Sequence, residues 1–373
     1  MRILFFNEGN LGNFILGQGQ LDTALQIGLD GADGVQARFA GLTPMGRWAQ
    51  AGASATIPLL SAAELDFGTL RWHAIQSLRA RRQLRAQLRC WPADVVHVHS
   101  QSIALALGAT MRELPTVVSL DTTVADWAAM PAWRPVRGHG AITIAPSRRL
   151  ERRALERAAL VLAWTAWARA AVERDVPAAR VVEHHPGLDL QRYRPAPRRP
   201  RERPRVLFVG GRFVEKGGED LLDALGDGLG RDVDLDLVTP APLPRRPGVT
   251  VHRLEPSDAR LLDLQQQADV LCLPTRGDTN PWVLLEAMAC ATPVISTPVG
   301  AIPDMLEHGR AGVLVPHSDP RALAAAIGAL LADAPRRERL AAAARERCEQ
   351  HYDARRQGPR LVRLLADLRS SGA

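Results

Sequence analysis

Short apolar runs alternate with helix-like stretches along most of this chain, and this alternation limits the folds available to it. Each run is long enough for one strand, and most intervals between runs are long enough for a helix. Such an order is typical of parallel sheets whose strands are joined by crossover helices. The apolar runs lie at Ile3–Phe6, Val95–Val98, Thr116–Leu120, Ala141–Ala145, Leu160–Ala163, Val181–Glu183, Val206–Val209, Leu235–Val238, Val249–His252, Val270–Leu273, Val294–Ser296 and Gly312–Val315.

A stretch rich in proline and arginine, residues 194–204, interrupts the alternation near the middle of the chain. Proline lacks a backbone N–H and blocks helices and central strands, so this stretch is predicted to be a linker. The 373 residues are enough for two domains. We expect an α/β protein with Rossmann-like domains at residues 1–193 and 205–350, whose parallel sheets face each other across a cleft. A C-terminal helix, residues 351–373, is expected to pack back on the first domain.

Composition argues against several classes of protein. Hydrophobic residues make up 46% of the chain and charged residues 23%, and no apolar run reaches the roughly 20 residues of a membrane span. The apolar stretch before Asn7 is too short for a secretory signal. The four cysteines are widely spaced without a C-x-x-C pair, which favours a reducing compartment and argues against a zinc site. We expect a cytoplasmic protein.

The chain is basic, with a net charge of +7 and a pI near 10.1. It has no recognised nucleic-acid motif and only 5% aromatic residues, so no nucleic-acid partner is expected. Part of the charge gathers in one helix-like stretch, where leucines separate Arg79, Arg81, Arg82, Arg85 and Arg89. Two interpretations stay open. The stretch is either a solvated face or a basic amphipathic helix in peripheral contact with an anionic membrane, at the inner face of the plasma membrane.

Lys216 is the only lysine of the chain, since the other 46 of its 47 cationic residues are arginines. It lies in a glycine-rich turn, Gly210–Gly218, between an apolar run and a helix-like segment. A strand, a tight turn and a helix N-terminus together present free backbone N–H groups to an anion. Arg212 adds a planar guanidinium, and Lys216 adds a compact ammonium. The turn predicts a diphosphate site, although strand–glycine–helix turns are also common without one.

A second candidate anion site follows the apolar run Val270–Leu273. Asn280 is a good N-cap and Pro281 suits the first helical position, so a helix is predicted to begin there. The backbone N–H groups expected to face the ligand are those of Trp282, Val283 and Leu284. Asp278 precedes this helix and Glu286 lies within it. Two carboxylates so placed can accept hydrogen bonds from two hydroxyl-bearing parts of one extended ligand, with phosphates between them.

Asp278 and Glu286, with seven residues between them and Ala287–Ser296 after them, resemble the E-x7-E region of family 4 retaining glycosyltransferases. The first acid is Asp instead of the usual Glu. The Gly-Arg-Phe-x-x-Lys-Gly turn lies upstream at the family's distance, and Asp94–His99 and His185–Asp189 fit the family's order. The resemblance extends from the first strand to about Val315 and is more specific in the second half. It implies a GT-B architecture.

The resemblance also implies roles for individual residues. Arg212 and Lys216 would neutralise the diphosphate of the donor, Glu286 would hold the ribose hydroxyls, and Asp278 would hold those of the transferred sugar. The stretch that ends at Glu255 falls where the family frames the base. Catalytic roles are thus assigned to Asp121, Arg212, Lys216 and Asp278. Substrate binding is assigned to Gly12, Gly17, Gly211, Glu255, Asn280, Trp282, Val283, Leu284 and Glu286.

The first half departs more from the family pattern. A glycine-rich loop that contains Gly12 and Gly17 follows the first apolar run, as it does in the family, and glycines there let the backbone approach a ligand closely. Family members commonly carry a His after the strand that corresponds to Thr116–Leu120, where it faces the transferred sugar. This chain has Asp121 instead. An acid there could bind a sugar hydroxyl or stabilise positive charge at the anomeric carbon.

The resemblance implies retaining transfer of a hexosyl group from a nucleotide diphosphate sugar to a hydroxyl of a polysaccharide, a lipid-linked glycan or a small glycoside. No cofactor and no metal are expected. Two other hypotheses stay open. A sugar phosphorylase or epimerase could use the same scaffold, because fold does not determine function. A non-catalytic protein that binds polyanions or membranes would also account for the basic composition.

Overall fold

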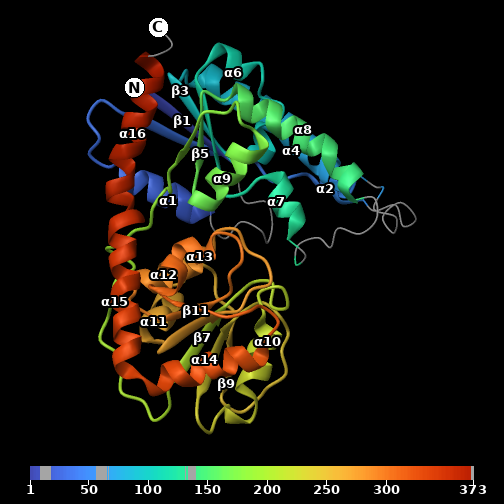
Figure 1. The fold of residues 1–373 in the computed structure, drawn as a ribbon. Helices are drawn as coiled ribbons and strands as arrows, with labels where there is room; N and C mark the ends of the chain where they lie inside the picture. The colour runs from blue at the N-terminus through green and yellow to red at the C-terminus, as the bar shows by residue number, and fades with distance from the viewer. Residues whose placement is uncertain (9–17, 56–64, 66, 131, 133–139, 371–373) are drawn as a thin grey trace. The chain divides into compact units, whose positions relative to one another are not determined.

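The computed structural model describes residues 1–8, 18–55, 65, 67–130, 132 and 140–370. The chain divides into two compact units, each with one six-stranded parallel sheet (Figure 1). Unit 1 comprises Met1–Gly187 and Arg355–Ala373, and unit 2 comprises Leu188–Ala354. The predicted α/β class with parallel sheets is confirmed. No helix in the described ranges has both the length and the apolar composition needed to cross a membrane.

The sheet of unit 1 has the order β2-β1-β3-β4-β5-β6. Chain order reverses between β1 and β3, and ligands of such sheets bind where the order reverses, beyond the carboxyl ends of the strands. The register places Asn7 beside His99, and His99 beside Ser119, at this edge. The strands are β1 (Arg2–Asn7), β2 (Gln36–Gly41), β3 (Val95–His99), β4 (Thr116–Leu120), β5 (Leu160–Ala163) and β6 (Val181–Glu183).

Alternating side chains of β1, β3 and β4 form the core on one face of this sheet. Leu84 of α4 and Leu155 of α8 pack into this core, and Val172 of α9 joins them. On α16, Gly358 packs so closely on α1 that a Cβ there would lie 1.8 Å from the carbonyl oxygen of Gly28. The helices are α1 (Gln18–Leu29), α2 (Arg47–Ser54), α4 (Gly68–Cys90), α5 (Gln101–Ala104), α6 (Thr110–Glu113), α7 (Val124–Ala129), α8 (Gly140–Arg157), α9 (Ala166–Asp175) and α16 (Ala354–Ser370).

Two elements of unit 1 differ from the prediction. The run Ala141–Ala145, predicted as a strand, belongs to α8, which continues through Pro146. Its buried residues, from Thr143 onward, recur at helical spacing, and Ile142 just before them is 60% exposed. The strand β2 was not predicted, because Gln36 and Arg38 break its apolar pattern. It forms as an edge strand, paired with β1 alone.

The sheet of unit 2 has the order β12-β11-β10-β7-β8-β9, so its chain order reverses between β7 and β10. The strands are β7 (Arg205–Val209), β8 (Asp234–Val238), β9 (Val249–His252), β10 (Val270–Leu273), β11 (Val294–Ser296) and β12 (Val313–Leu314). The helices are α10 (Gly218–Leu225), α11 (Ala259–Gln267), α12 (Trp282–Ala289), α13 (Ile302–Met305), α14 (Pro320–Ala332) and α15 (Ala334–His351).

The stretch at residues 194–204, predicted as a linker, packs on α11 within unit 2. Arg199 forms an ion pair with Asp263 at 2.8 Å, and the Gln267 side chain donates to the carbonyl of Pro197 at 3.0 Å. The boundaries between the units lie after Gly187 and after Ala354, not at the predicted linker and residue 350. Prolines keep this stretch out of a sheet, but its carbonyl groups still accept hydrogen bonds from side chains.

Candidate functional site

The candidate site of unit 2 lies where β7 and β10 end side by side. The turn after β7 passes directly against the loop after β10, and the N–H of Arg276 donates to the carbonyl of Glu215 at 2.9 Å. Gly217 has φ +77°, and a Cβ there would lie 2.1 Å from the carbonyl oxygen of Pro274. Only glycine fits this contact, because it tolerates the left-handed conformation and occupies no space beyond the backbone. The glycine-rich turn therefore fixes one loop against the other.

We expect Gly217→Ala to destabilise unit 2 by about 3 kcal/mol or more, because the clash with Pro274 adds to the backbone strain. Gly31→Ala in unit 1 is the matched control, since Gly31 has φ +74° but open space around its Cβ position. It should cost only about 1–2 kcal/mol. Thermal unfolding of both variants checks this. Equal losses in the two would show that the contact with Pro274 contributes nothing.

Lys216 and Asp278 form an ion pair across these two loops, although 62 positions separate them. Both side chains are largely buried, with exposures of 16% and 11%. Arg212 lies on the same turn, where its guanidinium donates to the Glu215 carboxylate at 2.6 Å and its side chain remains about one-third exposed. The structure thus brings together three of the residues to which catalysis was assigned.

The loop that carries Asp278 is held from a second side by the turn after β11. Gly300 has φ +56°, and a Cβ there would lie 2.1 Å from the carbonyl oxygen of Asp278. The N–H of Ala301 donates to the carbonyl of Thr279 at 3.1 Å. The buried hydroxyl of Thr297 donates to the carbonyl of Thr275 at 2.6 Å. These contacts fix the loop before α12 in one conformation.

Glu286 lies in α12 and is 3% exposed. Gln265 of α11 donates to one carboxylate oxygen at 2.6 Å, and the hydroxyl of Tyr193 donates to the other at 3.3 Å. A carboxylate oxygen can accept more than one hydrogen bond. Sequence reasoning did not identify Gln265 or Tyr193 as partners of Glu286. Tyr193 follows the His185–Asp189 stretch of the resemblance, but nothing in that position signals a contact with α12.

The start of α12 differs from the prediction by one residue. Pro281, not Asn280, is the N-cap, and its side chain makes no capping bond. The N–H of Leu284 donates to the carbonyl of Pro281 at 3.1 Å, so the first turn of the helix already uses it. Trp282 and Val283 are partly exposed at this helix end, and Asn280 is buried before it. Of the three predicted N–H groups, that of Leu284 is therefore satisfied within the helix.

The remaining predicted residues of unit 2 are less closely associated with this pair of loops. Gly211 is exposed on the turn after β7. Glu255 is exposed beyond β9, two strands away from β7 in the sheet, so the structure does not bring it next to the Lys216–Asp278 pair. Its backbone carbonyl accepts a hydrogen bond from the N–H of Asp258 at 3.0 Å.

In unit 1, polar side chains gather where β1, β3 and β4 end. The hydroxyl of Ser100 donates to Glu8, and Asp121 lies close enough to interact with Glu8 electrostatically. Burial raises the pKa of Glu8 to about 7, the Ser100 hydrogen bond opposes this, and the charge of Asp121 adds to it. Sequence reasoning missed Glu8 and Ser100 as site residues. The sequence marked them only by their positions, because each lies two residues after the end of an apolar run.

Two histidines of this unit are packed parts of the fold. His99 stacks on Trp164 with ring centroids 4.5 Å apart, and its Nδ1 lies 3.1 Å from the hydroxyl of Ser119. Burial lowers the pKa of His97 to about 3 and that of His99 to about 4, so both rings are neutral at physiological pH. Gly12 and Gly17, predicted to bind substrate, lie outside the described residues.

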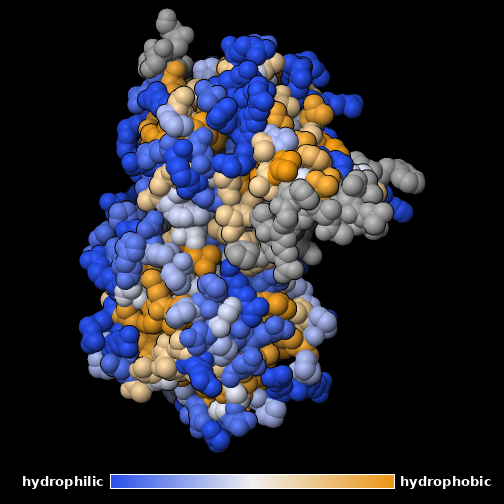
Figure 2. All heavy atoms as spheres, turned by 45° about the vertical axis from the view of Figure 1, so that its right-hand side comes forward, coloured by the Kyte–Doolittle hydropathy of each residue, from blue (hydrophilic) through white to orange (hydrophobic). Residues whose placement is uncertain are grey.

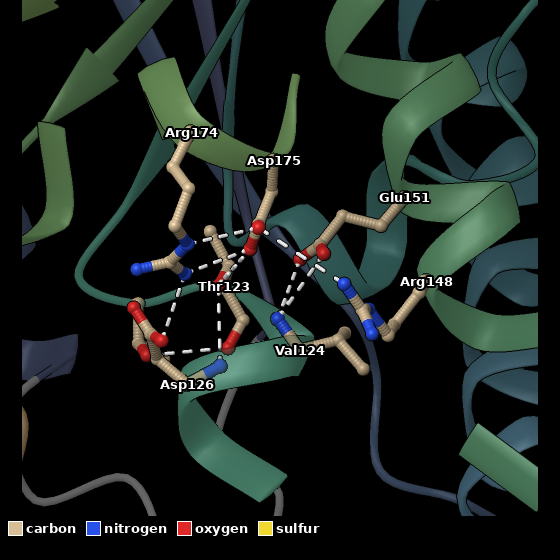
Figure 3. Close-up of polar contacts among 8 residues, drawn as sticks. Thr123, Val124, Asp126, Arg148, Glu151, Arg174 and Asp175 are labelled. Atoms are coloured by element: carbon tan, nitrogen blue, oxygen red, sulfur yellow. Dashed lines mark hydrogen bonds and ion pairs between the residues drawn. The ribbon is translucent and has the colours of Figure 1, made fainter. Parts of the chain in front are cut away.

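A network of acids and arginines fixes the helix that follows Asp121 (Figure 3). The N-cap Thr123 accepts from the N–H of Asp126 at 3.3 Å, and Glu151 of α8 accepts from the N–H of Val124 at 2.9 Å. Arg174 of α9 donates to Asp126 and to Asp175, each at 2.9 Å. Helix α7 is thus tied to both α8 and α9. The end of β4, where Asp121 lies, leads directly into this anchored helix.

Burial raises the pKa of Glu151 from 4.5 to about 8, although the hydrogen bond from Val124 opposes the shift. The folded chain therefore keeps this proton between about pH 4.5 and pH 8, whereas the unfolded chain releases it, and stability falls as the pH rises through this window. Glu151→Gln can accept the same hydrogen bond without a charge. We expect it to raise Tm by several degrees near pH 9 and by little near pH 4. Parallel Tm profiles for the two proteins would contradict this.

Comparison with known proteins extends these observations. Residues 41–192 match the family model Glycosyltransferase Family 4, and residues 203–333 match Glycosyl transferases group 1. The alpha-maltose-1-phosphate synthase of Mycolicibacterium smegmatis is 30% identical over 298 residues, which cover 70% of this chain and 75% of that protein. This chain belongs to glycosyltransferase family 4. The resemblance inferred from Asp278, Glu286 and the Lys216 turn is confirmed.

Another relative is D-inositol 3-phosphate glycosyltransferase 2 of Catenulispora acidiphila, 32% identical over 187 residues. That match covers 42% of this chain and less than half of the relative, 44% of its length.

Sucrose-phosphate synthase from Thermosynechococcus elongatus has the same fold, with a TM-score of 0.72, 20% identity and full coverage of both chains. Anabaena HepE in complex with UDP aligns with a TM-score of 0.70 and 16% identity over 98% of this chain and 100% of that one. The complex of HepE with UDP-glucose aligns with a TM-score of 0.69 and 16% identity, again over 98% of this chain and 100% of that one. The predicted GT-B fold is confirmed.

Proposed function

We propose that this family 4 protein transfers a hexosyl group from a nucleotide diphosphate sugar to a hydroxyl acceptor with retention of anomeric configuration. The observation that carries the proposal is the Lys216–Asp278 ion pair on two loops that Gly217 and Gly300 hold in place. Cationic and anionic side chains then meet at the reversal of strand order, where Rossmann-like units bind phosphates and sugars. Structures with the same fold hold UDP and UDP-glucose, which supports such a donor.

The unit 2 residues would act on the leaving group. When the bond between the anomeric carbon and the phosphate oxygen breaks, negative charge develops on the diphosphate. Lys216 and Arg212 would stabilise this charge, and because the structure already fixes Lys216, little reorganisation is needed. In the bound state Arg212 would divide its guanidinium between Glu215 and a phosphate oxygen. Positive charge from these two side chains is the basis for expecting activity without a metal.

The carboxylates would position the two ends of the donor. Glu286 would accept hydrogen bonds from the ribose hydroxyls while Gln265 and Tyr193 keep its side chain in place. Asp278 would accept from hydroxyls of the transferred sugar. In unit 1, Asp121 would stabilise positive charge that develops at the anomeric carbon. Gly211 and the helix end at Trp282 and Val283 would line the phosphates.

The acceptor side is assigned to unit 1. The edge of its sheet where β1, β3 and β4 end carries Glu8, Ser100 and Asp121, whose side chains can bind hydroxyls. With a pKa of about 7, Glu8 is in part protonated near neutral pH, so it can donate as well as accept a hydrogen bond. These side chains suit the hydroxyls of a polysaccharide, a lipid-linked glycan or a small glycoside.

The sole lysine gives a direct test of the donor site. An amine-selective acylating reagent modifies only Lys216 and the amino group of Met1, and mass spectrometry separates the two. UDP-, GDP- and ADP-glucose are first screened by thermal shift, because a ligand that binds the folded state raises Tm. The nucleotide sugar that raises Tm should slow acylation of Lys216 at least tenfold and leave that of Met1 unchanged. A nucleotide sugar that binds without protecting Lys216 would place the site elsewhere.

Transfer is then assayed with that donor and a set of hydroxyl acceptors, with and without a chelator. We expect product of retained configuration and rates within about twofold in the chelator, because cationic side chains supply the charge that a metal would. Cleavage of a disaccharide by phosphate, with no use of any nucleotide sugar, would instead identify a phosphorylase.

A further inference from the structure

Helices α4 and α8 pack side by side in unit 1 (Figure 1). Together they hold the excess positive charge of the protein. They contain eleven arginines and two glutamates, a surplus of nine positive charges, whereas the whole chain has a surplus of seven. The rest of the chain is therefore slightly acidic. One of the two glutamates, Glu151, is buried with a pKa near 8 and adds little negative charge at neutral pH. The basic pI of the protein thus reflects one pair of neighbouring helices.

The arginines of this pair are poorly neutralised by neighbours. Helix α4 has six arginines and no acidic residue. Among the residues that the structure describes, Arg82, Arg89, Arg149 and Arg153 form no ion pair, and all four are exposed. Elsewhere on α8, Arg152 forms an ion pair with Glu156 at 3.7 Å, and Arg148 forms one with Asp175 at 4.0 Å. Uncompensated charge of this density favours an anionic partner.

Large apolar side chains are exposed on the same two helices. Ile142 of α8 is 60% exposed and Leu78 of α4 is 57% exposed. Phe67, the N-cap of α4, is 37% exposed. Within the described part of unit 1, these are the large hydrophobic residues with this degree of exposure. Figure 2 shows hydrophobic residues interspersed with strongly hydrophilic ones on the upper part of the protein.

We propose that the α4–α8 face is a docking surface for an anionic lipid bilayer. Its arginines would contact lipid phosphates, and Leu78 and Ile142 would enter the boundary between headgroups and acyl chains. A polyanion in water, such as nucleic acid, would satisfy the arginines but offer nothing to the apolar side chains. The combination of the two kinds of side chain is why we commit to a membrane. This inference does not depend on the donor site of unit 2.

Helix α8, which carries part of this face, also contacts the helix that follows Asp121. Glu151 of α8 holds the first residue of α7, and α7 begins three positions after Asp121. A bilayer at α4–α8 would therefore contact the unit that carries Asp121. A lipid-linked acceptor could then present its sugar to unit 1 without leaving the membrane.

Sedimentation of the full chain with lipid vesicles tests the proposal. We expect binding to vesicles of phosphatidylcholine with about 30% phosphatidylglycerol, none to phosphatidylcholine alone, and weaker binding as salt rises from about 0.1 M to 0.5 M. Each arginine at such a surface contributes about fivefold to affinity. The variant R82Q/R89Q/R149Q/R153Q should therefore bind on the order of several hundredfold more weakly. Absence of wild-type binding to the anionic vesicles overturns the proposal.

A matched variant controls for net charge. R245Q/R246Q/R336Q/R339Q also removes four exposed arginines, all from unit 2, and should bind within about twofold of wild type. Equal loss in both variants would show that only total charge matters and would overturn the assignment to this face. Unfolding profiles of both confirm folding, and the salt dependence of wild type remains decisive if either variant fails to fold.

The apolar contribution separates a membrane from other polyanions. L78S/I142S should weaken vesicle binding at least tenfold and leave binding to heparin or duplex DNA unchanged. If this variant binds vesicles as wild type does, the face recognises anionic polymers in general and the membrane proposal fails.

Discussion

Replacement of Lys216 by alanine is expected to lower kcat/KM about 1,000-fold, a loss of roughly 4 kcal/mol in transition-state stabilisation. The ammonium is the only lysine charge in the chain, and it is held against Asp278 in a largely buried position. Its removal takes away the cation that would face the leaving diphosphate. It also leaves the Asp278 carboxylate without this partner, so the loop before α12 should bind the sugar less well. Steady-state kinetics with the donor found by binding measures the effect.

Two further variants sharpen this prediction. Lys216→Arg keeps a charge but replaces a compact donor by a planar one, so partial activity is expected. Arg203→Ala removes a cation from another ion pair of unit 2. Arg203 pairs with Asp234 at 3.1 Å, and this pair lies near the amino ends of β7 and β8. This substitution should change kcat/KM by less than about twofold. A Lys216→Ala enzyme with near-normal turnover would rule out the proposed donor site.

Glu286→Ala is expected to raise KM for the donor and to lower kcat/KM by about 100-fold, because the variant would lose the two hydrogen bonds that the proposed ribose hydroxyls would donate to a charged acceptor. The carboxylate is 3% exposed and already has two protein donors, so some stability is lost as well. Calorimetric titration with the nucleotide measures the loss of donor affinity, and thermal unfolding measures the loss of stability.

Tyr193→Phe is the matched control for Glu286. It removes the 3.3 Å hydrogen bond to the carboxylate and leaves the carboxylate itself in place. We expect a loss of less than about fivefold in donor affinity. If Tyr193→Phe weakened nucleotide binding as much as Glu286→Ala, the role of Glu286 would be structural and the assignment to ribose would fail.

The strands that build both sheets could largely be predicted from the sequence. Parallel strands covered by helices on both faces need continuous apolar runs, and Val206–Val209 and Val270–Leu273 are of this kind. An edge strand has no such requirement. Gln36 and Arg38 therefore hid β2, whose conformation follows from its pairing with β1. Ala141–Ala145 misled in the opposite direction, because a short apolar run by itself does not distinguish a strand from a segment of helix.

The site was predicted as a set of residues rather than as an arrangement. The Lys216 turn and the spacing of Asp278 and Glu286 were visible in the sequence because each motif is local. The ion pair between Lys216 and Asp278 was not, because it depends on β7 and β10 lying side by side in the sheet. Likewise, Gln265, Tyr193 and Glu286 come together from three separate segments. The roles of these residues with a ligand stay predictions.

Local patterns in the amino-acid order thus determined the α/β class, the family and the motifs that bear charge, because strand periodicity, glycine turns and helix starts depend on neighbouring residues. Tertiary structure alone decided which of these motifs touch, that residues 194–204 pack on α11, and that most of the unbalanced arginines lie on two adjacent helices. Contacts between distant segments arise from strand order and from helix packing across a sheet. No stretch of sequence, read by itself, contains that information.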